Sequence, residues 1–472
     1  MSRLRVALFA VVVGTGILTV VGVAAVNHAD VPGPVEGEEL SGGETTVFDT
    51  TENAFGYAAR NLRSEMRNSF FVGNSFFKQN WVIAPASTSA RDGLGPLFNA
   101  RSCSACHFKD GRGRPPREGE EMVSMLLRLS RPGDADERAG VRPDETFGDQ
   151  LQQNAIPGAT GEGVPVVEYE EVVGTFADGE SYSLRKPDYR IERGGYGDVP
   201  EDLEISPRVA PQMIGMGLLE AIPEEVIIAQ ADPDDLDGDG ISGRPNWVWN
   251  HEVGVTQIGR FGWKANTATV REQVAGAFLG DMGLTSPTRT HGGASLSELG
   301  VASLAYEDED EPEVTEKIFD HVVFYSSVLA VPARRDVDDP EVLVGKKLFD
   351  RLGCVACHVP EYQTGVIEDL PEVSGQRIFP YTDLLLHDMG DGLADGRADF
   401  QADGREWRTP PLWGIGLIEN VNGHTEFLHD GRARNLEEAI LWHGGEAEAS
   451  RDAYKKLAAD ERAAVIAFLE SL

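Results

Sequence analysis

Cysteine is scarce in this sequence, and its scarcity limits the kinds of site that the chain can build. The 472 residues contain four cysteines, and all four lie in two C-x-x-C-H segments at residues 103–107 and 354–358. No thiol is therefore left for a structural disulfide. A zinc site would need its second ligand pair within about 12–20 residues, and these pairs lie much farther apart. A thioredoxin-like C-x-x-C needs no histidine after it.

Positive charge is also in short supply. Lysine and arginine together number 42, against 78 aspartates and glutamates, which gives a formal net charge of −36. This charge excludes nucleic acid and anionic membrane surfaces as partners, because both would repel the protein. It suits either a cationic electron donor or solubility in high salt, and the scarcity of lysine beside arginine favours the second. A hydrophobic content of 41% is typical of a globular protein.

A long apolar run occurs at the N-terminus, from Val6 to Val26, behind Arg3 and Arg5. Its 21 residues exceed the 7–15 of an ordinary signal peptide, and about 20 are enough to span a bilayer. Residues 1–29 are therefore predicted to be a signal peptide or an uncleaved membrane anchor. Either one leaves the positive end in the cytoplasm and places the body in the periplasm or outside the cell. Residues 30–45 are polar and are expected to form a linker.

The two C-x-x-C-H segments carry the attachment signature of c-type haem. Two thiols three residues apart can each form a thioether with one vinyl group of the same porphyrin, and the next histidine ligates the iron. The sequence therefore predicts two covalently bound haems. Their attachment residues are Cys103, Cys106, Cys354 and Cys357, and their iron ligands are His107 and His358. Haem of this type is attached outside the cytoplasmic membrane, in agreement with the N-terminal segment.

The hydrophobic pattern predicts a mainly α fold with two cytochrome c-like haem domains, at residues 46–335 and 336–472. Residues 108–255 are expected to be a long irregular or β insertion in the first domain. Helices are expected within residues 48–77, 311–335, 340–357 and 453–472. Strands are expected over residues 123–129, 166–173 and 182–191, with a hairpin turn at 177–179.

Alternating carboxylates near the end of the insertion resemble the first half of a calcium loop. Asp235, Asp237 and Asp239 would supply carboxylates, and Ile241 would supply its carbonyl oxygen. The twelfth position is Asn246, where such a loop has a glutamate that binds with both oxygens. Both a calcium site and an acidic surface turn are compatible with this pattern.

An internal repeat makes the two haem sites unequal. Residues 431–440 compare with residues 269–274, and each stretch follows one of the two C-x-x-C-H segments. Extending the comparison places Ala277 where the C-terminal copy has His443. This helix therefore offers an imidazole as sixth ligand to one haem and no side-chain ligand to the other.

Residues 408–412, 427–432 and 436–439 resemble the C-terminal haem domain of bacterial di-haem cytochrome c peroxidases. The chain from about Phe48 onward also resembles the di-haem oxidoreductase family, through residues 95–99, 259–265 and 383–390. The resemblance implies reduction of hydrogen peroxide at the first haem, with electrons delivered through the second. The donor would be a small electron-transfer protein or a quinol-linked cytochrome. His443 stands where those peroxidases have methionine, so the resemblance implies a bis-histidine second haem of lower potential.

The same resemblance assigns three residues to the first haem. Trp263 corresponds to the tryptophan between the haems, Gln273 follows ten residues later, and Asp281 stands near the place of the distal glutamate. A carboxylate there moves a proton between the two oxygens of peroxide as their bond breaks. The alternative interpretations are core packing for Trp263 and a helix-terminal turn for Asp281.

Other side chains are rival ligands for the two irons. Met282 and His251 are the rivals at the first haem, and His387 and Met389 are the rivals at the second, while His429 is expected to order backbone or a haem propionate. A chain with both irons closed would be an electron carrier and not an enzyme. A third hypothesis is an oxidase that modifies a partner protein.

Overall fold

The computed structural model describes residues 33–117, 119–192, 195–290, 295–304 and 312–472. It is 30% helical and 17% strand, so the predicted mainly α fold with two cytochrome c-like domains is wrong. The strands pair two at a time, and every pair is antiparallel. The predicted signal peptide or anchor at residues 1–29 lies outside the described residues. Within the described part of the chain, no helix has the length and apolar character needed to cross a membrane.

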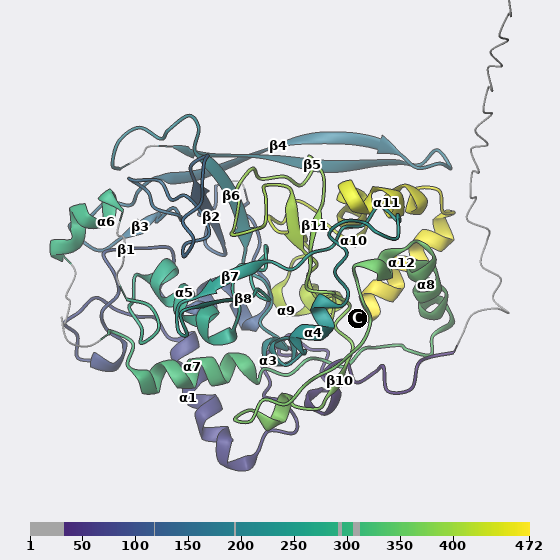
Figure 1. The fold of residues 1–472 in the computed structure, drawn as a ribbon, viewed down its shortest axis with the longest axis horizontal. Helices are drawn as coiled ribbons and strands as arrows, with labels where there is room; N and C mark the ends of the chain where they lie inside the picture. Colours follow the sequence, from purple (N-terminus) through teal and green to yellow (C-terminus); the bar gives the residue numbers. More distant parts are fainter. Residues whose placement is uncertain (1–32, 118, 193–194, 291–294, 305–311) are drawn as a thin grey trace, which may run out of the picture.

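The helices are mostly short and are spread along the chain (Figure 1). Their bounds are α1 Arg67–Lys78, α2 Cys103–Cys106, α3 Met216–Glu220, α4 Glu224–Ile228, α5 Val270–Met282, α6 Leu296–Val301, α7 Glu316–Ser327, α8 Pro340–Arg351, α9 Ile418–Asn422, α10 Leu436–Trp442, α11 Glu448–Tyr454 and α12 Ala459–Ser471.

The longest strands lie within the predicted insertion, and shorter strands recur in the C-terminal half. Their bounds are β1 Leu97–Phe98, β2 Met125–Ser130, β3 Asn154–Ala155, β4 Val164–Thr175, β5 Ser181–Glu192, β6 Glu204–Val209, β7 Trp247–Asn250, β8 Val255–Ile258, β9 Tyr362–Gln363, β10 Arg377–Ile378, β11 Leu386–Asp388 and β12 Glu406–Arg408. The pairs are β1 with β3, β2 with β6, β4 with β5, β7 with β8, β9 with β10 and β11 with β12.

Each half of the chain contains two helices that cross closely at a glycine. A Cβ on Gly73 of α1 would lie 2.0 Å from the carbonyl oxygen of His321 in α7. A Cβ on Gly345 of α8 would lie 1.8 Å from the carbonyl oxygen of Ala464 in α12. Only glycine allows such an approach of two backbones. The crossing helices therefore recur in both halves, although the halves differ in most other elements.

The second C-x-x-C-H segment does not continue helix α8, as the sequence had predicted for residues 340–357. The helix ends at Arg351, Gly353 adopts a positive φ of 82°, and Cys354–Ala356 form a separate 3-10 turn. A phenylalanine of the preceding helix lies near each motif histidine. The ring centroids of Phe77 and His107 are 6.2 Å apart, and those of Phe349 and His358 are 6.0 Å apart.

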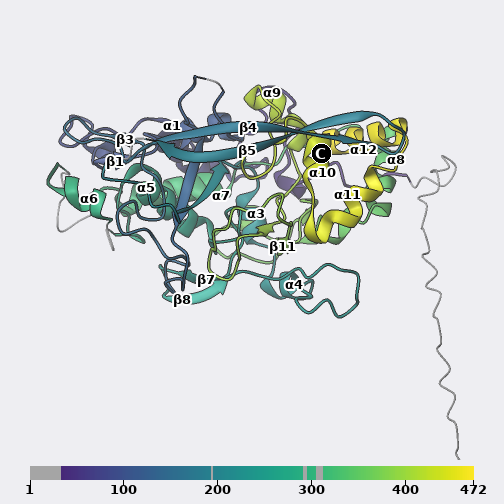
Figure 2. The ribbon, with the colours of Figure 1, turned by 90° about the horizontal axis from the view of Figure 1, so that it is seen from above.

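The β4–β5 hairpin joins the two halves of the molecule. It runs along the top in Figure 1 and spans most of the length of the body when seen from above (Figure 2). At its tip, Phe176 is buried 3.9 Å beneath the guanidinium of Arg462 in α12. The backbone N–H of Ala177 donates to the carbonyl of Lys455 at 3.0 Å, and Arg462 donates to Asp178 at 2.9 Å. The insertion therefore reaches from the first half onto the second.

The described part of the predicted linker, residues 33–45, packs against the body. Glu38 is 1% exposed and pairs with Arg334 at 2.9 Å and with Lys346 of α8. The backbone N–H of Glu44 donates to the side chain of Gln376 at 2.8 Å. This segment therefore lies against the C-terminal half, not free in solution.

Candidate functional site

One large cavity connects the two C-x-x-C-H segments. Its volume is about 1590 Å³, which exceeds the roughly 300–1,000 Å³ of a pocket for one drug-sized ligand. Its walls include the motif cysteines and histidines of both segments. The predicted residues Trp263, Gln273, Asp281 and His443 also line it. The structure therefore brings all the predicted haem-site residues to a single space that can hold two large groups.

Burial and a backbone carbonyl keep each of the two motif histidines in its neutral form. Nδ1 of His107 donates to the carbonyl of Pro211 at 2.7 Å, and Nδ1 of His358 donates to the carbonyl of Tyr381 at 3.0 Å. Burial lowers the pKa of each imidazole to about 4. A neutral ring that donates from Nδ1 keeps its lone pair on Nε2, the atom that would bind iron. The chemistry of these two side chains thus fits a haem on each side of the cavity.

The four cysteines are not arranged as reactive or metal-binding thiolates. Burial raises the pKa of Cys103 and of Cys354 to about 12, and it also raises the pKa of Cys106 and Cys357. Thiolate chemistry requires the opposite shift, to a lowered pKa. Their common place in the cavity wall suits covalent attachment of a group that fills the cavity.

Helices α5 and α10 begin in the same way, which supports the internal repeat. The hydroxyl of Thr269 accepts from the backbone N–H of Glu272 at 3.1 Å. The side-chain oxygen of Asn435 accepts from the backbone N–H of Glu438 at 2.8 Å. Both residues are N-caps that bond to the third residue of their helix. The sequence comparison therefore aligns two structurally equivalent helix starts.

The equivalent position beyond these caps differs between the two helices. His443 follows the last residue of α10, and its Nδ1 donates to the carbonyl of Ala439 at 2.7 Å. Burial lowers its pKa, and a charge on His443 would in turn lower the pKa of His358. Both rings line the same cavity. In α5 the same place is held by Ala277, which also lines the cavity. An imidazole therefore faces the His358 side, and a methyl group faces the cavity from α5.

Gln273, Ala277 and Asp281 follow one another at intervals of four along α5, so they share the face that lines the cavity. Asp281 accepts a hydrogen bond from Nε2 of Gln150 at 2.9 Å. Burial raises the pKa of Asp281, although Arg128 opposes the shift. The charge of Asp281 would also raise the pKa of Cys103, which places this carboxyl near the first motif.

Trp263 lies in the core between the halves. Its indole N–H donates to the carbonyl of Val209 at 2.8 Å, and its own carbonyl accepts from the backbone N–H of Arg408 at 2.9 Å. The guanidinium of Arg112 lies 5.1 Å from its ring centroid. The side chain packs in the core and also lines the cavity. This placement agrees both with core packing and with the role of a tryptophan between the two haems.

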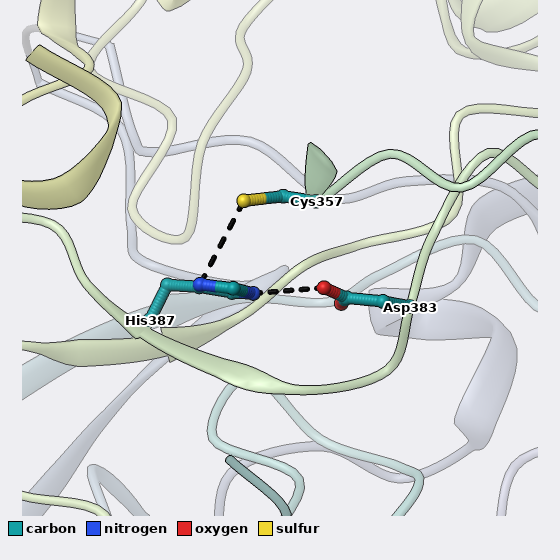
Figure 3. A group of neighbouring side chains, drawn as sticks. All are labelled: Cys357, Asp383 and His387. Carbon is teal, nitrogen blue, oxygen red and sulfur yellow. Dashed lines mark hydrogen bonds and ion pairs between the residues drawn. The ribbon is translucent and has the colours of Figure 1, made fainter. Parts of the chain in front are cut away.

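The rival ligand His387 is occupied by two carboxylates. Nε2 lies 2.8 Å from a carboxylate oxygen of Asp383, and Nδ1 lies 2.7 Å from one of Glu446. Figure 3 shows His387 between Cys357 and Asp383. Burial opposes a charge on this ring, but its hydrogen bonds with Asp383, Cys357 and Glu446, in which the two carboxylates accept, outweigh burial and raise its pKa well above the ordinary value. Cys357, Asp383 and His387 could bring ligand atoms within 4.8 Å of one another. A protonated imidazole bonded at both nitrogens has no lone pair for a metal.

The remaining rivals are less clearly occupied. Nε2 of His251 lies 3.2 Å from the carbonyl of Arg138 and therefore acts as a donor there. Met282 is 1% exposed and belongs to the main hydrophobic core, yet it also lines the cavity. Met389 likewise lies in the cavity wall. Met282 and Met389 therefore stay possible ligands by their place in the cavity wall.

His429 has a nitrogen that the described protein atoms do not satisfy. Its ring stacks on Trp407, with centroids 3.7 Å apart, and it is 4% exposed. Its Nε2 is buried without a hydrogen-bond partner among the described residues. Buried polar atoms are nearly always bonded. Because His429 lines the cavity, a polar group of a bound molecule, such as a propionate, fits this atom.

The acidic turn uses its carboxylates largely for its own backbone. Asp235 accepts from the N–H of Gly240 at 3.1 Å, and Asp239 accepts from the N–H of Ile241 at 2.8 Å. The three carboxylates that could share an ion are those of Asp232, Asp235 and Asp237. Asp232 was not among the predicted ligands. Calcium binding stays a prediction.

The main residues that the sequence did not single out are the partners of the predicted ones. Gln150, which holds Asp281, and Glu446, which holds His387, lie far from them in the chain. Gln150 and Gln152 alternate along one extended segment and both line the cavity. That alternation of two glutamines was the only signal available before the structure.

A protein-family model described as "Di-haem oxidoreductase, putative peroxidase" matches residues 36–131 and 149–472. The match includes both C-x-x-C-H segments and every residue named above as lining the cavity. No curated protein and no solved structure matches the chain.

Proposed function

Because the chain belongs to this family of di-haem oxidoreductases, we propose that it is an exported enzyme that reduces hydrogen peroxide. Its two haems are bound covalently, one through Cys103 and Cys106 and the other through Cys354 and Cys357. The single observation that carries the proposal is the inequality of the two ends of the cavity. An imidazole, His443, faces one motif, whereas Ala277 and Asp281 face the cavity at the other.

The haems would supply the redox chemistry, and His107, His358 and His443 are the imidazoles that would hold them. His107 and His358 would hold the two groups from one side, since each has a free Nε2. His443 would close the second group from the other side. Reduction of one peroxide uses two electrons and two protons and releases two waters, so the first end needs a proton carrier.

Asp281 is the side chain that we propose as the proton carrier. Burial raises its pKa, so this carboxyl holds a proton more readily than an exposed aspartate would. The hydrogen bond from Gln150 keeps one oxygen of this carboxyl in place. Asp281 would take a proton from the oxygen that binds and give it to the oxygen that leaves as water. Gln273, on the same face of α5, would orient the peroxide.

Electrons would reach the first end past Trp263, which packs between the halves and lines the shared cavity. The electron donor would be a small protein or a quinol-linked cytochrome. A cationic donor surface suits the net charge of −36, because opposite charges speed association.

Reciprocal variants at the equivalent helix positions test the proposal. We expect the wild type to show a high-spin signal from the first haem in the ferric or half-reduced state. Ala277→His should convert this signal to low spin and abolish peroxide turnover, because an imidazole then closes the iron. His443→Ala should open the second haem instead. His321→Ala, on α7 away from the cavity wall, is the control and should leave both spectra unchanged.

Two results would favour the other hypotheses. A wholly low-spin spectrum that persists on half-reduction and does not respond to peroxide or cyanide would identify an electron carrier. A stable oxidised state that forms with peroxide and decays only when a partner protein is added would identify an oxidase acting on that partner.

A further inference from the structure

A chain of groups that can pass protons leads inward from helix α6. The carboxylate of Glu298 accepts from the hydroxyl of Ser295 at 3.0 Å, and the two hydroxyls of Ser295 and Ser297 are 2.8 Å apart. The hydroxyl of Ser297 donates to Oε1 of Glu162 at 2.5 Å. Glu298 is half-buried, whereas Ser297 and Glu162 are 0% exposed. A carboxyl or a hydroxyl both donates and accepts, so each of these groups can relay a proton.

Two glutamines connect the inner end of this chain to Asp281. Oε2 of Glu162 accepts from the backbone N–H of Gln152 at 2.5 Å. The side-chain nitrogens of Gln152 and Gln150 both donate to the carbonyl of Gly280, at 2.6 and 2.9 Å. Gln150 also donates to Asp281 at 2.9 Å. The two amides therefore fix the space between the two carboxyls, Glu162 and Asp281.

The oxygen atoms of these two amides are not satisfied by the protein. Oε1 of Gln150 and Oε1 of Gln152 are buried without a hydrogen-bond partner among the described residues. Both side chains line the cavity. Buried acceptors of this kind are normally bonded to ordered water. An amide cannot relay a proton as a hydroxyl does, but a water held between two amide oxygens can.

We propose that Glu298, Ser295, Ser297 and Glu162 conduct protons from the surface toward Asp281, with water held by Gln150 and Gln152 completing the path. The inference rests on the proposed function, because each peroxide reduced consumes two electrons from the donor and two protons from solvent. The O–O bond breaks, and the two oxygens leave as two waters. Asp281 moves a proton between those oxygens, and Glu162 replenishes the protons from outside without touching the substrate.

The electrostatics of Glu162 suit a proton carrier. Burial raises its pKa to about 8, although the hydrogen bonds from Ser297 and Gln152 oppose the shift. The negative charges of Glu298 and Asp144 raise the pKa further. The charge of Glu162 adds to the effect of burial in raising the pKa of Tyr196, whose hydroxyl donates to the carbonyl of Thr160 at 2.8 Å. Glu162 therefore holds a proton at neutral pH and loses it as the pH rises past its pKa.

The test compares Glu162→Gln with the matched control Glu220→Gln. Glu220 is also a carboxyl whose pKa burial raises, but it bonds to the backbone of Val270 and lies outside the chain of groups. We expect Glu162→Gln to lower kcat with hydrogen peroxide and a chemical reductant by about tenfold to a hundredfold. KM for peroxide should stay within about twofold, since no substrate contact is lost. The alkaline fall of kcat near the pKa of about 8 should disappear in this variant alone.

A second variant and a spectroscopic measurement separate conduction from folding. Ser297→Ala breaks the chain but keeps Glu162 and Asp281 themselves, and it should also lower kcat. Infrared difference spectra on reduction should show a protonated carboxyl band in the wild type that is missing in Glu162→Gln and retained in Glu220→Gln.

The two proposals fail in different ways. If Glu162→Gln and Ser297→Ala reduce peroxide at the wild-type rate and with the wild-type pH profile, the proton path is wrong and the peroxidase proposal stands. If the wild type does not reduce peroxide, both are wrong.

Discussion

At the scale of single residues, the cavity is defined by what faces each motif histidine. Burial and a backbone carbonyl keep His107 and His358 neutral and aimed in the same way. The difference between the ends comes from α5 and α10, which present Ala277 and His443 at equivalent places. In the proposed function, the chemistry at each end would therefore be decided by these two side chains on a repeated helix, and not by the C-x-x-C-H segments.

The role of Asp281 as a proton carrier is tested by Asp281→Asn. Asparagine keeps the size of the side chain and the bond to Gln150, but it cannot exchange a proton. We expect kcat for peroxide to fall about 10²- to 10⁴-fold, the usual contribution of general acid–base catalysis. Asp320→Asn, which removes an exposed partner of Arg271, is the control. Turnover of Asp281→Asn at the wild-type rate would show that Asp281 is only a helix-terminal residue.

His387 should make stability depend on pH. Burial opposes its charge, but Asp383, Cys357 and Glu446 raise its pKa in the folded state above the ordinary value of about 6.5. The protonated ring then stabilises the fold fully below about pH 6.5, and this contribution is lost as the pH rises through the raised pKa. Replacing His387 by glutamine should lower the free energy of unfolding by about 3–5 kcal/mol at low pH, because two buried carboxylates lose their partner.

Urea unfolding at a series of pH values measures this effect. The stability difference between wild type and His387→Gln should shrink as the pH rises. A difference that is constant with pH would mean that His387 is neutral in the folded protein.

At the scale of secondary structure, the β4–β5 hairpin is the element that reaches farthest. Phe176 at its tip is 4% exposed, whereas Val173 on the same strand region is 72% exposed. Phe176→Ala should lower the free energy of unfolding by about 3–5 kcal/mol, as for other buried phenylalanines. Val173→Ala should change it by no more than about 0.5 kcal/mol.

Limited proteolysis provides an independent measurement of the same prediction. Cleavage within the hairpin should become faster in Phe176→Ala, because the tip is released from Arg462 and Tyr454. Equal cleavage rates in the two variants would show that the tip is not held by this contact.

The sequence predicted the elements whose signals are local. The alternating residues and the 177–179 turn indicated the hairpin, and β4 and β5 extend the predicted strands by a few residues at their ends. The helical content was overestimated, because pairs such as β2 with β6 and β11 with β12 depend on partners distant in the chain. A short strand of this kind has no periodicity of its own.

The candidate site follows the same division. The motifs, the repeat and the resemblance located residues that all line the cavity. The partners that tune those residues could not be found from spacing, because Gln150 and Glu162 reach Asp281 and Ser297 only through the fold. Likewise, the sequence presents His387 as a possible iron ligand. Its two carboxylate partners, which occupy both ring nitrogens, are visible only in the structure.

At the scale of the whole molecule, the net charge of −36 should lower the stability of the folded protein. Like charges on a compact body repel one another, and salt screens this repulsion over a Debye length of about 8 Å at 0.15 M. We expect the melting temperature at pH 7 to rise with sodium chloride. Near the isoelectric point of about 4.6, the same salt should have little effect. A melting temperature independent of salt at pH 7 would show that the buried ion pairs already neutralise the excess.

The β4–β5 hairpin also bears on how such a chain can change during evolution. Its sequence lies in the first half, but Phe176 and Asp178 are seated on Arg462 and its neighbours near the C-terminus. A recombination event that exchanged residues 336–472 for those of a relative would preserve both motifs. It would still remove the residues around Arg462 that the tip of the hairpin contacts. We therefore expect the two halves to be inherited as one unit, with a substitution of Arg462 accompanied by a matching substitution at the hairpin tip.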